Sequence, residues 1–456
     1  MIIGPDLHQI GYCQVSRVRY FYIGKTPTLT TETDMSEDKK LSRLAETLIE
    51  SEIVRMNGEI RKKMSGGERI FNYTIGDYDP QIFPIPHELE EEIIFAYRQH
   101  LTNYPAGDGE PELRKAVSKF IAERQGLDYG MDEILIASGG RPLIYTLFRA
   151  IVDAGEKVVY TVPSWNNNHY VHFVDGRHCV VQTHPEHDFM PSAEDLRPHL
   201  SDAVLLSLSS PLNPTGTTFG KEQLQAICDL VVEENERRPA GQKKLHLMFD
   251  QIYWQLTYGS TEHHDPVRLR PELRPYTVFI DGISKAFAAT GVRVGWSMGP
   301  AHIIGRMKSI LSHVGAWSPL PEQKATSRFL MQKGAVDQYL KILKSGLNER
   351  LQKIHKGFRQ LKKEGHPVDA IVPQAAIYLT VKIDLCGRTL PDGTRLETQA
   401  DVTAYLLNKA GLAIVPFHVF GAQPTSPWYR LSVGTVKIED IHEMFQKLKV
   451  ALKETS

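Results

Sequence analysis

The sequence predicts an α/β protein with a mostly parallel sheet, helices on both faces of that sheet, and a smaller α+β unit after it. Short apolar runs alternate with helical segments between residues 134 and 299, and the runs are nearly continuous in apolar character. Strands that are buried on both faces have this composition. A chain of 456 residues is also too long for one small core and suits two lobes.

Seven apolar runs are expected to form the large sheet. They cover residues 134–138, 157–162, 178–183, 203–209, 245–250, 277–283 and 293–299. The helical segments before and between them cover residues 88–100, 110–125, 141–153, 192–199 and 221–236. Strands that alternate with helices in this way favour a parallel sheet.

The rest of the chain is expected to form the smaller unit and an amino-terminal segment. Helices are predicted at 39–64, 320–333, 335–364, 397–410 and 437–453, and strands at 377–384, 413–416 and 429–433. We therefore expect a large domain at 88–325, a small domain at 326–456, and a segment at 35–87 that packs with the small domain. Residues 1–34 are either an extension of unknown role or sequence that precedes a true start at Met35.

Composition excludes several classes of function. Lys plus Arg number 53 and Asp plus Glu number 54, so no long-range field for nucleic acid or an anionic membrane is expected. The four cysteines form no C-x-x-C pair, which argues against a disulfide framework and a metal site. No run approaches eighteen apolar residues and no secretory signal is evident, so we expect a cytoplasmic protein.

Ligands in open α/β sheets bind at the carboxyl ends of the strands, so the residues there are candidates for a site. In "ASGGRPLIY" (137–145), Gly139 and Gly140 allow a close approach to an anion at a helix N-terminus, although such residues often only tighten a turn. Trp165 follows another strand and either stacks on a flat ring or belongs to the core.

Two further strings carry polar groups at strand ends. Asn213 lies in "SSPLNPTG" (209–216), where it presents an amide, or where the string is simply a rigid turn. Asp250 ends an apolar strand and needs a cationic partner, which is either a protonated heteroaromatic nitrogen or a buried arginine. Tyr253 follows three residues later.

The most specific string is "DGISKAFAATGVRVGW" (281–296). Lys285 closes a strand in apolar company, where desolvation should lower its pKa and free the amine for Schiff-base chemistry. Ser284 precedes it and Arg293 follows after eight residues. A lysine, a hydroxyl and an arginine in this arrangement suit the attachment of a carbonyl compound beside a bound phosphate.

In order and spacing, these five strings resemble the class I/II aminotransferases of pyridoxal-phosphate (PLP) fold type I, and most of all their bacterial aspartate aminotransferase branch. The resemblance runs from about residue 40 to the end. It implies that Lys285 forms the Schiff base with PLP and that Asp250 pairs with the ring nitrogen. It also implies that Asn213 and Tyr253 bind the phenolic oxygen, and that Trp165 stacks on the ring.

The same resemblance places other residues around the cofactor and substrate. Gly139, Gly140, Ser284 and Arg293 are expected about the phosphate. "TNYPAGDGEPELR" (102–114) is similar to the stretch whose tyrosine, here Tyr104, reaches the phosphate of a neighbouring subunit, which implies a homodimer.

Three residues are expected to bind the substrate along with Trp165 and Asn213. Arg430, in "WYRLSVGT", would hold the α-carboxylate through a bidentate contact, and the backbone of Gly76 would lie against it. Arg141 stands where the bacterial enzymes carry a lysine for the distal carboxylate, unless it is only a surface residue of the first helical turn. Two strings, "QAAIYL" (374–379) and "PFHVFG" (416–421), depart from the family pattern and leave the side-chain specificity open.

The expected activity is a ping-pong transfer of an amino group, favoured from aspartate or glutamate, to a 2-oxo acid such as 2-oxoglutarate. In this reaction the released Lys285 amine acts as the general base. A PLP-dependent lyase or β-decarboxylase would share every cofactor residue and is the main alternative. A PLP-sensing regulatory protein would need a DNA-binding module, and residues 1–34 lack that pattern.

Overall fold

A computed structural model of the chain describes residues 41–48 and 52–455. The expectations for residues 1–34 therefore lie outside the described residues. The chain divides into a unit of residues 1–47, in which α1 (Arg43–Thr47) is described, and a unit of residues 48–456. The prediction of one continuous helix over 39–64 is wrong, because Leu48 is helical in neither α1 nor α2 (Glu52–Ser65).

The predicted large sheet is confirmed and has the strand order β2-β8-β7-β6-β5-β3-β4. Its strands are β2 (Ile134–Ala137), β3 (Lys157–Val162), β4 (Arg177–Gln182), β5 (Ala203–Ser209), β6 (His246–Asp250), β7 (Thr277–Gly282) and β8 (Gly295–Met298). Strand β8 runs antiparallel to both of its neighbours, β2 and β7. The five strands β7, β6, β5, β3 and β4 are parallel to one another. The carboxyl ends of the parallel strands therefore share one edge.

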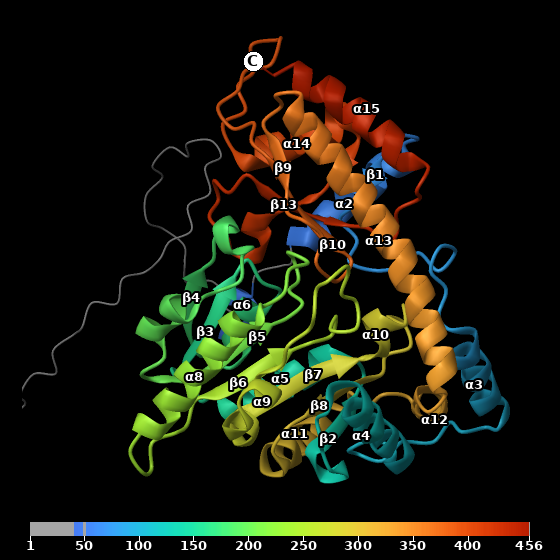
Figure 1. The fold of residues 1–456 in the computed structure, drawn as a ribbon, viewed down its shortest axis with the longest axis vertical. Coiled ribbons are helices and arrows are strands. Elements are labelled where there is room, and N and C mark those ends of the chain that lie inside the picture. The colour runs from blue at the N-terminus through green and yellow to red at the C-terminus, as the bar shows by residue number, and fades with distance from the viewer. Residues whose placement is uncertain (1–40, 49–51, 456) are drawn as a thin grey trace, which may run out of the picture. The chain divides into compact units, whose positions relative to one another are not determined.

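Helices cover both faces of this sheet (Figure 1). One face packs against α5 (Gly140–Ile151), α6 (Asn167–Phe173) and α11 (Ala301–Val314). The other face packs against α3 (His87–Arg98), α4 (Pro111–Gln125), α7 (Ala193–Leu196), α8 (Lys221–Arg237), α9 (Pro266–Leu269) and α12 (Leu320–Leu330). Strand side chains alternate between the two cores: Met248 and Ile280 face α5, whereas Phe249 and Phe279 face α4.

A second core forms around the long helix α13 (Lys333–Lys363). An antiparallel sheet of order β12-β13-β10-β9 packs in it. Its members and their neighbours are β9 (Val368–Ala370), β10 (Tyr378–Ile383), α14 (Gln399–Ala410), β12 (Val415–Pro416), the turn η5 (Phe417–Phe420), β13 (Trp428–Ser432) and α15 (Asp440–Lys453). The strand predicted at 413–416 is in fact two, because β11 (Leu412–Ala413) leaves this sheet and pairs in parallel with β1 (Phe71–Asn72).

That pairing ties the early part of the second unit to the end of the chain. Tyr73 O accepts a hydrogen bond from Ser432 N, and Gly434 O accepts one from Asp79 N. The segment that carries Gly76 is therefore held beside β13, which carries Arg430. The proposed domain limits at residues 87 and 325 stay predictions. None of the helices in the described part of the chain is both long and apolar enough to cross a membrane.

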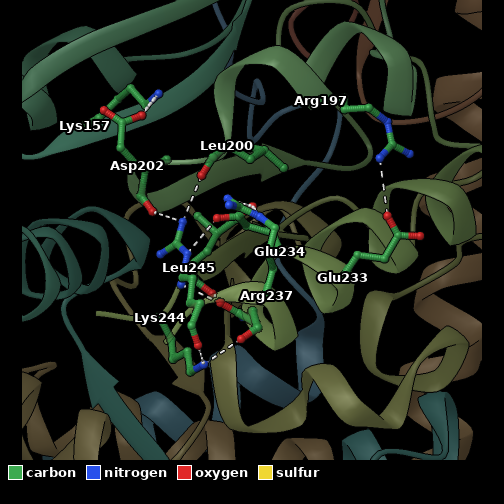
Figure 2. Close-up of polar contacts among 12 residues, drawn as sticks. Lys157, Arg197, Leu200, Asp202, Glu233, Glu234, Arg237, Lys244 and Leu245 are labelled. Carbon is green, nitrogen blue, oxygen red and sulfur yellow. Dashed lines mark hydrogen bonds and ion pairs between the residues drawn. The ribbon is translucent and has the colours of Figure 1, made fainter. Parts of the chain in front are cut away.

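A polar network holds the amino-terminal edge of the large sheet together (Figure 2). Arg238, the residue after α8, is buried and donates to Glu234 Oε1, to Lys243 O, and to the carbonyls of Leu200 and Ala203 at distances of 2.6–2.8 Å. The adjacent Lys244 ammonium donates to Asn235 O at 2.6 Å. These bonds fix the end of α8 to the starts of β5 and β6, far along the strands from their carboxyl ends.

Candidate active site

A cavity of about 630 Å³ lies at the carboxyl ends of the parallel strands. Residues from β5, β6 and β7, from the start of α5 and from β13 line it. The predicted site residues among its lining are Gly76, Gly140, Arg141, Trp165, Asn213, Asp250, Tyr253, Ser284, Lys285, Arg293 and Arg430. Segments that are more than 350 residues apart in the sequence therefore meet here, as the ligand rule for open α/β sheets predicts.

Lys285 projects into this cavity from α10 (Ile283–Ala286), a single helical turn that follows β7, and not from the strand itself. Its ammonium donates to Gly76 O at 2.7 Å, and Tyr78 donates its hydroxyl proton to Lys285 O at 2.7 Å. Burial lowers the pKa of Lys285 to about 8; Asp77 opposes this shift, whereas the nearby arginines reinforce it. An appreciable fraction of the amine is therefore neutral near neutral pH.

The loop before α5 and the turn after α10 form a cradle for an anion. Arg293, with φ 61°, donates to Ser138 O at 2.9 Å and to Thr290 O at 2.7 Å. Gly139 has φ 81°, and a Cβ there would lie 2.1 Å from the Arg293 guanidinium, so a side chain is excluded. Gly140 begins α5, and Ser284 is buried beside Lys285. Free amides at a helix N-terminus and a guanidinium together suit a phosphate.

Asp250 is a carboxylate without a cation. It ends β6, and its Oδ1 accepts a hydrogen bond from Ile252 N at 3.1 Å. Burial raises the pKa of Asp250 to about 6, and the Ile252 amide opposes that rise. No lysine or arginine among the described residues forms an ion pair with it, so the alternative of a buried arginine partner is not found. Asp250 therefore fits a cationic group on a bound molecule.

Arg430 lies opposite Lys285 and is only 2% exposed. Its terminal nitrogens donate to Asn213 Oδ1 at 3.0 Å and to Thr74 O at 2.7 Å, while its Nε has no partner. The guanidinium carbon also lies 4.9 Å from the centre of the Phe420 ring. Burial lowers the pKa of Arg430, yet the group stays cationic. A buried cation with one free donor and neutral partners suits a carboxylate.

A pair of tyrosines and a tryptophan under an arginine complete the walls of the cavity. The Tyr253 and Tyr378 hydroxyls lie 2.7 Å apart, and burial raises the pKa of Tyr253 well above its usual value. The Arg141 guanidinium lies over the Trp165 ring, 5.6 Å from its centre. Trp165 is partly exposed to the cavity, so its ring can meet a flat molecule.

Two predicted site residues, Gly139 and Tyr104, are outside the lining of the cavity. Gly139 lies against the lining residue Arg293, whereas Tyr104 is not brought to the cavity by this single chain. Tyr104 is 87% exposed and makes an edge contact with Trp317 at 5.7 Å. Its resemblance-based role concerns a neighbouring subunit, and that role stays a prediction.

The structure also adds residues that the sequence analysis missed. Asp77 accepts a hydrogen bond from the Thr290 hydroxyl at 2.6 Å and faces Lys285. Tyr378 contacts Tyr253, and its hydroxyl would lie 2.8 Å from a Cβ at Gly76. Both lie in strings that had been noted for another reason: Asp77 follows Gly76, and Tyr378 belongs to the divergent "QAAIYL" string.

The residues present fit PLP as a cofactor. The cradle at Gly139 and Arg293 suits its phosphate, Asp250 suits a protonated ring nitrogen, and Lys285 suits its aldehyde. The seven-stranded sheet and this arrangement are those of PLP fold type I. One solved relative in that fold is the aspartate aminotransferase of Rhizobium meliloti, with a TM-score of 0.84 and 25% identity over 91% of this chain and 100% of the other.

Sequence comparisons identify the family within that fold. The model of "Aminotransferase class I and II" matches residues 68–448, so the chain belongs to this family of PLP-dependent aminotransferases. The Rhizobium meliloti aspartate aminotransferase is 27% identical over 409 residues, 89% of this chain and 94% of the relative. The aspartate/prephenate aminotransferase of Thermus thermophilus is 30% identical over 384 residues, 84% of this chain and 92% of the relative. The lyase alternative finds no support in these comparisons.

Proposed function

We propose that this aminotransferase takes the amino group of aspartate or glutamate and passes it to a 2-oxo acid such as 2-oxoglutarate, by a ping-pong mechanism. The placement of Arg141 and Arg430 in the lining of one cavity carries this proposal, because a dicarboxylic amino acid has an anionic group for each. The relatives named above as aspartate aminotransferases also support it.

Lys285 acts as the base in this proposal. Bound PLP supplies an aldehyde that condenses with amines and a ring that withdraws electrons from the substrate's α-carbon. The Lys285 amine, once released by the substrate, lies in the cavity with a lowered pKa and takes the proton from that carbon. While the amine is free, Gly76 O accepts its hydrogen bond and the Asp77 carboxylate attracts it electrostatically.

The remaining residues bind and orient. Arg430 grips the substrate α-carboxylate, with Asn213 Oδ1 and the Thr74 carbonyl aligning its guanidinium. Asp250 keeps the pyridine nitrogen of the cofactor protonated, because a carboxylate with few hydrogen bonds gains most from a cationic neighbour. With PLP bound, Tyr253 and Asn213 would donate hydrogen bonds to its phenolic oxygen, and Trp165 would cover its ring.

Arg141 is the residue proposed to select an acidic side chain. It is exposed at the mouth of the cavity, in the first turn of α5, and its guanidinium is braced against Trp165. It makes no ion pair with a carboxylate of the described residues. A planar cation held in this way can meet a distal carboxylate through two hydrogen bonds.

A donor screen against 2-oxoglutarate tests this proposal. Aspartate or glutamate should give the highest kcat/KM, and 2-oxo acid should form without ammonia or carbon dioxide. Arg141→Ala should reduce kcat/KM for aspartate about 10- to 100-fold, with little change for alanine, which lacks the distal carboxylate. Equal losses for both donors, or no loss for aspartate, would contradict the assignment.

We also propose that the protein acts as a cytoplasmic homodimer in which Tyr104 reaches the partner's cofactor. The 87% exposure of an aromatic side chain beside Trp317 supports an interface there. Sedimentation analysis would measure the mass, and Tyr104→Phe should weaken cofactor binding without changing that mass.

A further inference from the structure

A second cavity, of about 720 Å³, is lined by the end of α4, the turn after β6 and the first half of α13. It shares no residue with the lining of the first cavity, which holds Lys285. Its size is within the range of sites for small molecules. The aminotransferase reaction proposed above makes no use of it.

Basic side chains without partners gather at this cavity. Arg268, Lys341 and Lys344 line it, and within the described part of the chain their side chains form no ion pair or hydrogen bond. Arg124, by contrast, is paired with Asp337 at 2.5 Å. Lys344 is half-buried, and burial lowers its pKa, as expected for a cation that lacks a neighbouring carboxylate.

The one other acid in the lining, Asp265, offsets only part of this positive charge. Asp265 is buried, and its Oδ1 accepts the backbone N–H of Arg268 at 2.9 Å, as the cap of α9. Burial raises the pKa of Asp265 to about 6 and Arg268 opposes that rise, so the carboxyl stays largely ionised at neutral pH. The lining nevertheless holds four basic side chains, Arg124, Arg268, Lys341 and Lys344, against two acids, Asp265 and Asp337. The cavity therefore has an excess of positive charge.

Two buried acceptors in the same cavity also lack donors. Gln255 is 8% exposed, and its Oε1 has no hydrogen-bond partner. His263 has its Nε2 3.4 Å from Gln251 Oε1, and its Nδ1 has no partner. Burial lowers the pKa of His263 to about 3, so the ring is neutral, and with Nε2 donating to Gln251 its Nδ1 is an acceptor. Buried acceptors without donors are costly unless a ligand or water meets them.

We propose that this cavity binds a small anion that also carries hydroxyl or amino groups. Its charged group would lie against Arg268, Lys341 and Lys344, and its donors would reach Gln255 Oε1 and His263 Nδ1. Hydroxylated phosphates and hydroxylated carboxylates both have this combination. The turn that holds Gln255 also holds Tyr253, whose side chain lines the first cavity.

Calorimetric titration of the PLP-loaded enzyme tests the proposal with glucose 6-phosphate, gluconate, inorganic phosphate and glucose. Glucose 6-phosphate or gluconate should bind, and whichever binds more tightly identifies the phosphate or the carboxylate as the anionic group. Inorganic phosphate should bind more weakly, and glucose should not bind. Lys344→Met should lower the affinity for the bound anion about tenfold, and Lys341→Met provides a second variant.

Two control variants show whether the anion occupies this cavity. Lys356→Met changes an exposed lysine of the same helix, outside the cavity, and should leave affinity unchanged. Gln255→Leu should weaken the hydroxylated anion and leave inorganic phosphate unaffected. The proposal is overturned if neither hydroxylated anion binds, if Lys344→Met and Lys341→Met bind as tightly as the parent, or if Arg141→Ala instead abolishes binding, which would place the anion in the amino-acid site.

Discussion

Two buried arginines at opposite edges of the large sheet have opposite surroundings. Arg238, at the amino-terminal edge, is 4% exposed and directs every one of its guanidinium nitrogens to an acceptor. Arg430, at the carboxyl-terminal edge, is 2% exposed and keeps an unpartnered Nε and no carboxylate. The guanidinium of Arg238 is fully hydrogen-bonded within the fold, whereas that of Arg430 keeps a donor that a ligand can use.

Buried acids show the same contrast. Glu234 receives hydrogen bonds from both Arg237 and Arg238. Asp250 receives one amide hydrogen bond, and burial raises its pKa. Because burying an unpaired charge is costly, such a group persists where a bound molecule supplies the missing partner. The incompletely paired edge is therefore the functional edge.

The largest effect that this comparison predicts concerns the two acids. Asp250→Asn removes the charge that we propose to pair with the cofactor nitrogen and should lower kcat about 10²- to 10³-fold, with the fold unchanged. Glu234→Gln should instead lower the free energy of unfolding and leave kcat of the folded enzyme unchanged. Steady-state kinetics and urea titration measure both. A kcat for Asp250→Asn within a factor of about two of the parent would contradict the conclusion that the incompletely paired edge is the functional one.

Substitution of the two arginines should likewise separate an effect on catalysis from an effect on stability. Arg430→Met should lower kcat/KM about 100-fold through lost carboxylate binding and change the free energy of unfolding by less than about 1 kcal/mol, because few bonds are broken. Arg238→Met removes one of the two arginine partners of Glu234 and the guanidinium donor to three carbonyls, and it should cost about 3 kcal/mol of stability, with KM unchanged. Equal losses of stability in the two variants would mean that Arg430 is also a structural residue.

A smaller effect is expected from pH. An amine attacks an aldehyde only when neutral, and the pKa of Lys285 is lowered to about 8 against about 10.4 for an ordinary lysine. The rate at which apoprotein takes up PLP should therefore rise about tenfold per pH unit below pH 8 and level off above it. Stopped-flow absorbance would measure this profile. A midpoint near the ordinary lysine value would show that burial does not tune this amine.

Much of the fold was predictable because the strands are apolar and short. The boundaries of β3 and β5 agree with prediction; Lys285 and Asn213 follow strands and Asp250 ends one, as expected. Helix α11 was missed although its apolar residues have helical spacing, because Gly299, Pro300 and Gly305 weaken the signal. The division of β11 from β12 depends on the long-range pairing of β11 with β1, which a local pattern does not contain.

The site residues that sequence reasoning missed act through distant partners. Tyr378 becomes part of the site only because β10 brings its hydroxyl to Tyr253, 125 residues away. Asp77 influences Lys285 because β1 pairs with β11 and places the Gly76 segment beside β13. Arg238 supports the fold and not the site, and its role was equally hidden. In the sequence it is one of several charged residues at the end of α8, and its four acceptors come together only in the folded chain.

The most direct test of the central claim is chemical mapping of the lysine that holds the cofactor. The PLP-loaded enzyme is reduced with borohydride, digested and examined by mass spectrometry, with Lys285→Ala treated in parallel. The modified peptide should carry its label on Lys285, and the variant should lose both the label and the visible absorbance. A label on another lysine of the parent, or an unlabelled parent that still transfers amino groups, would contradict the assignment of Lys285.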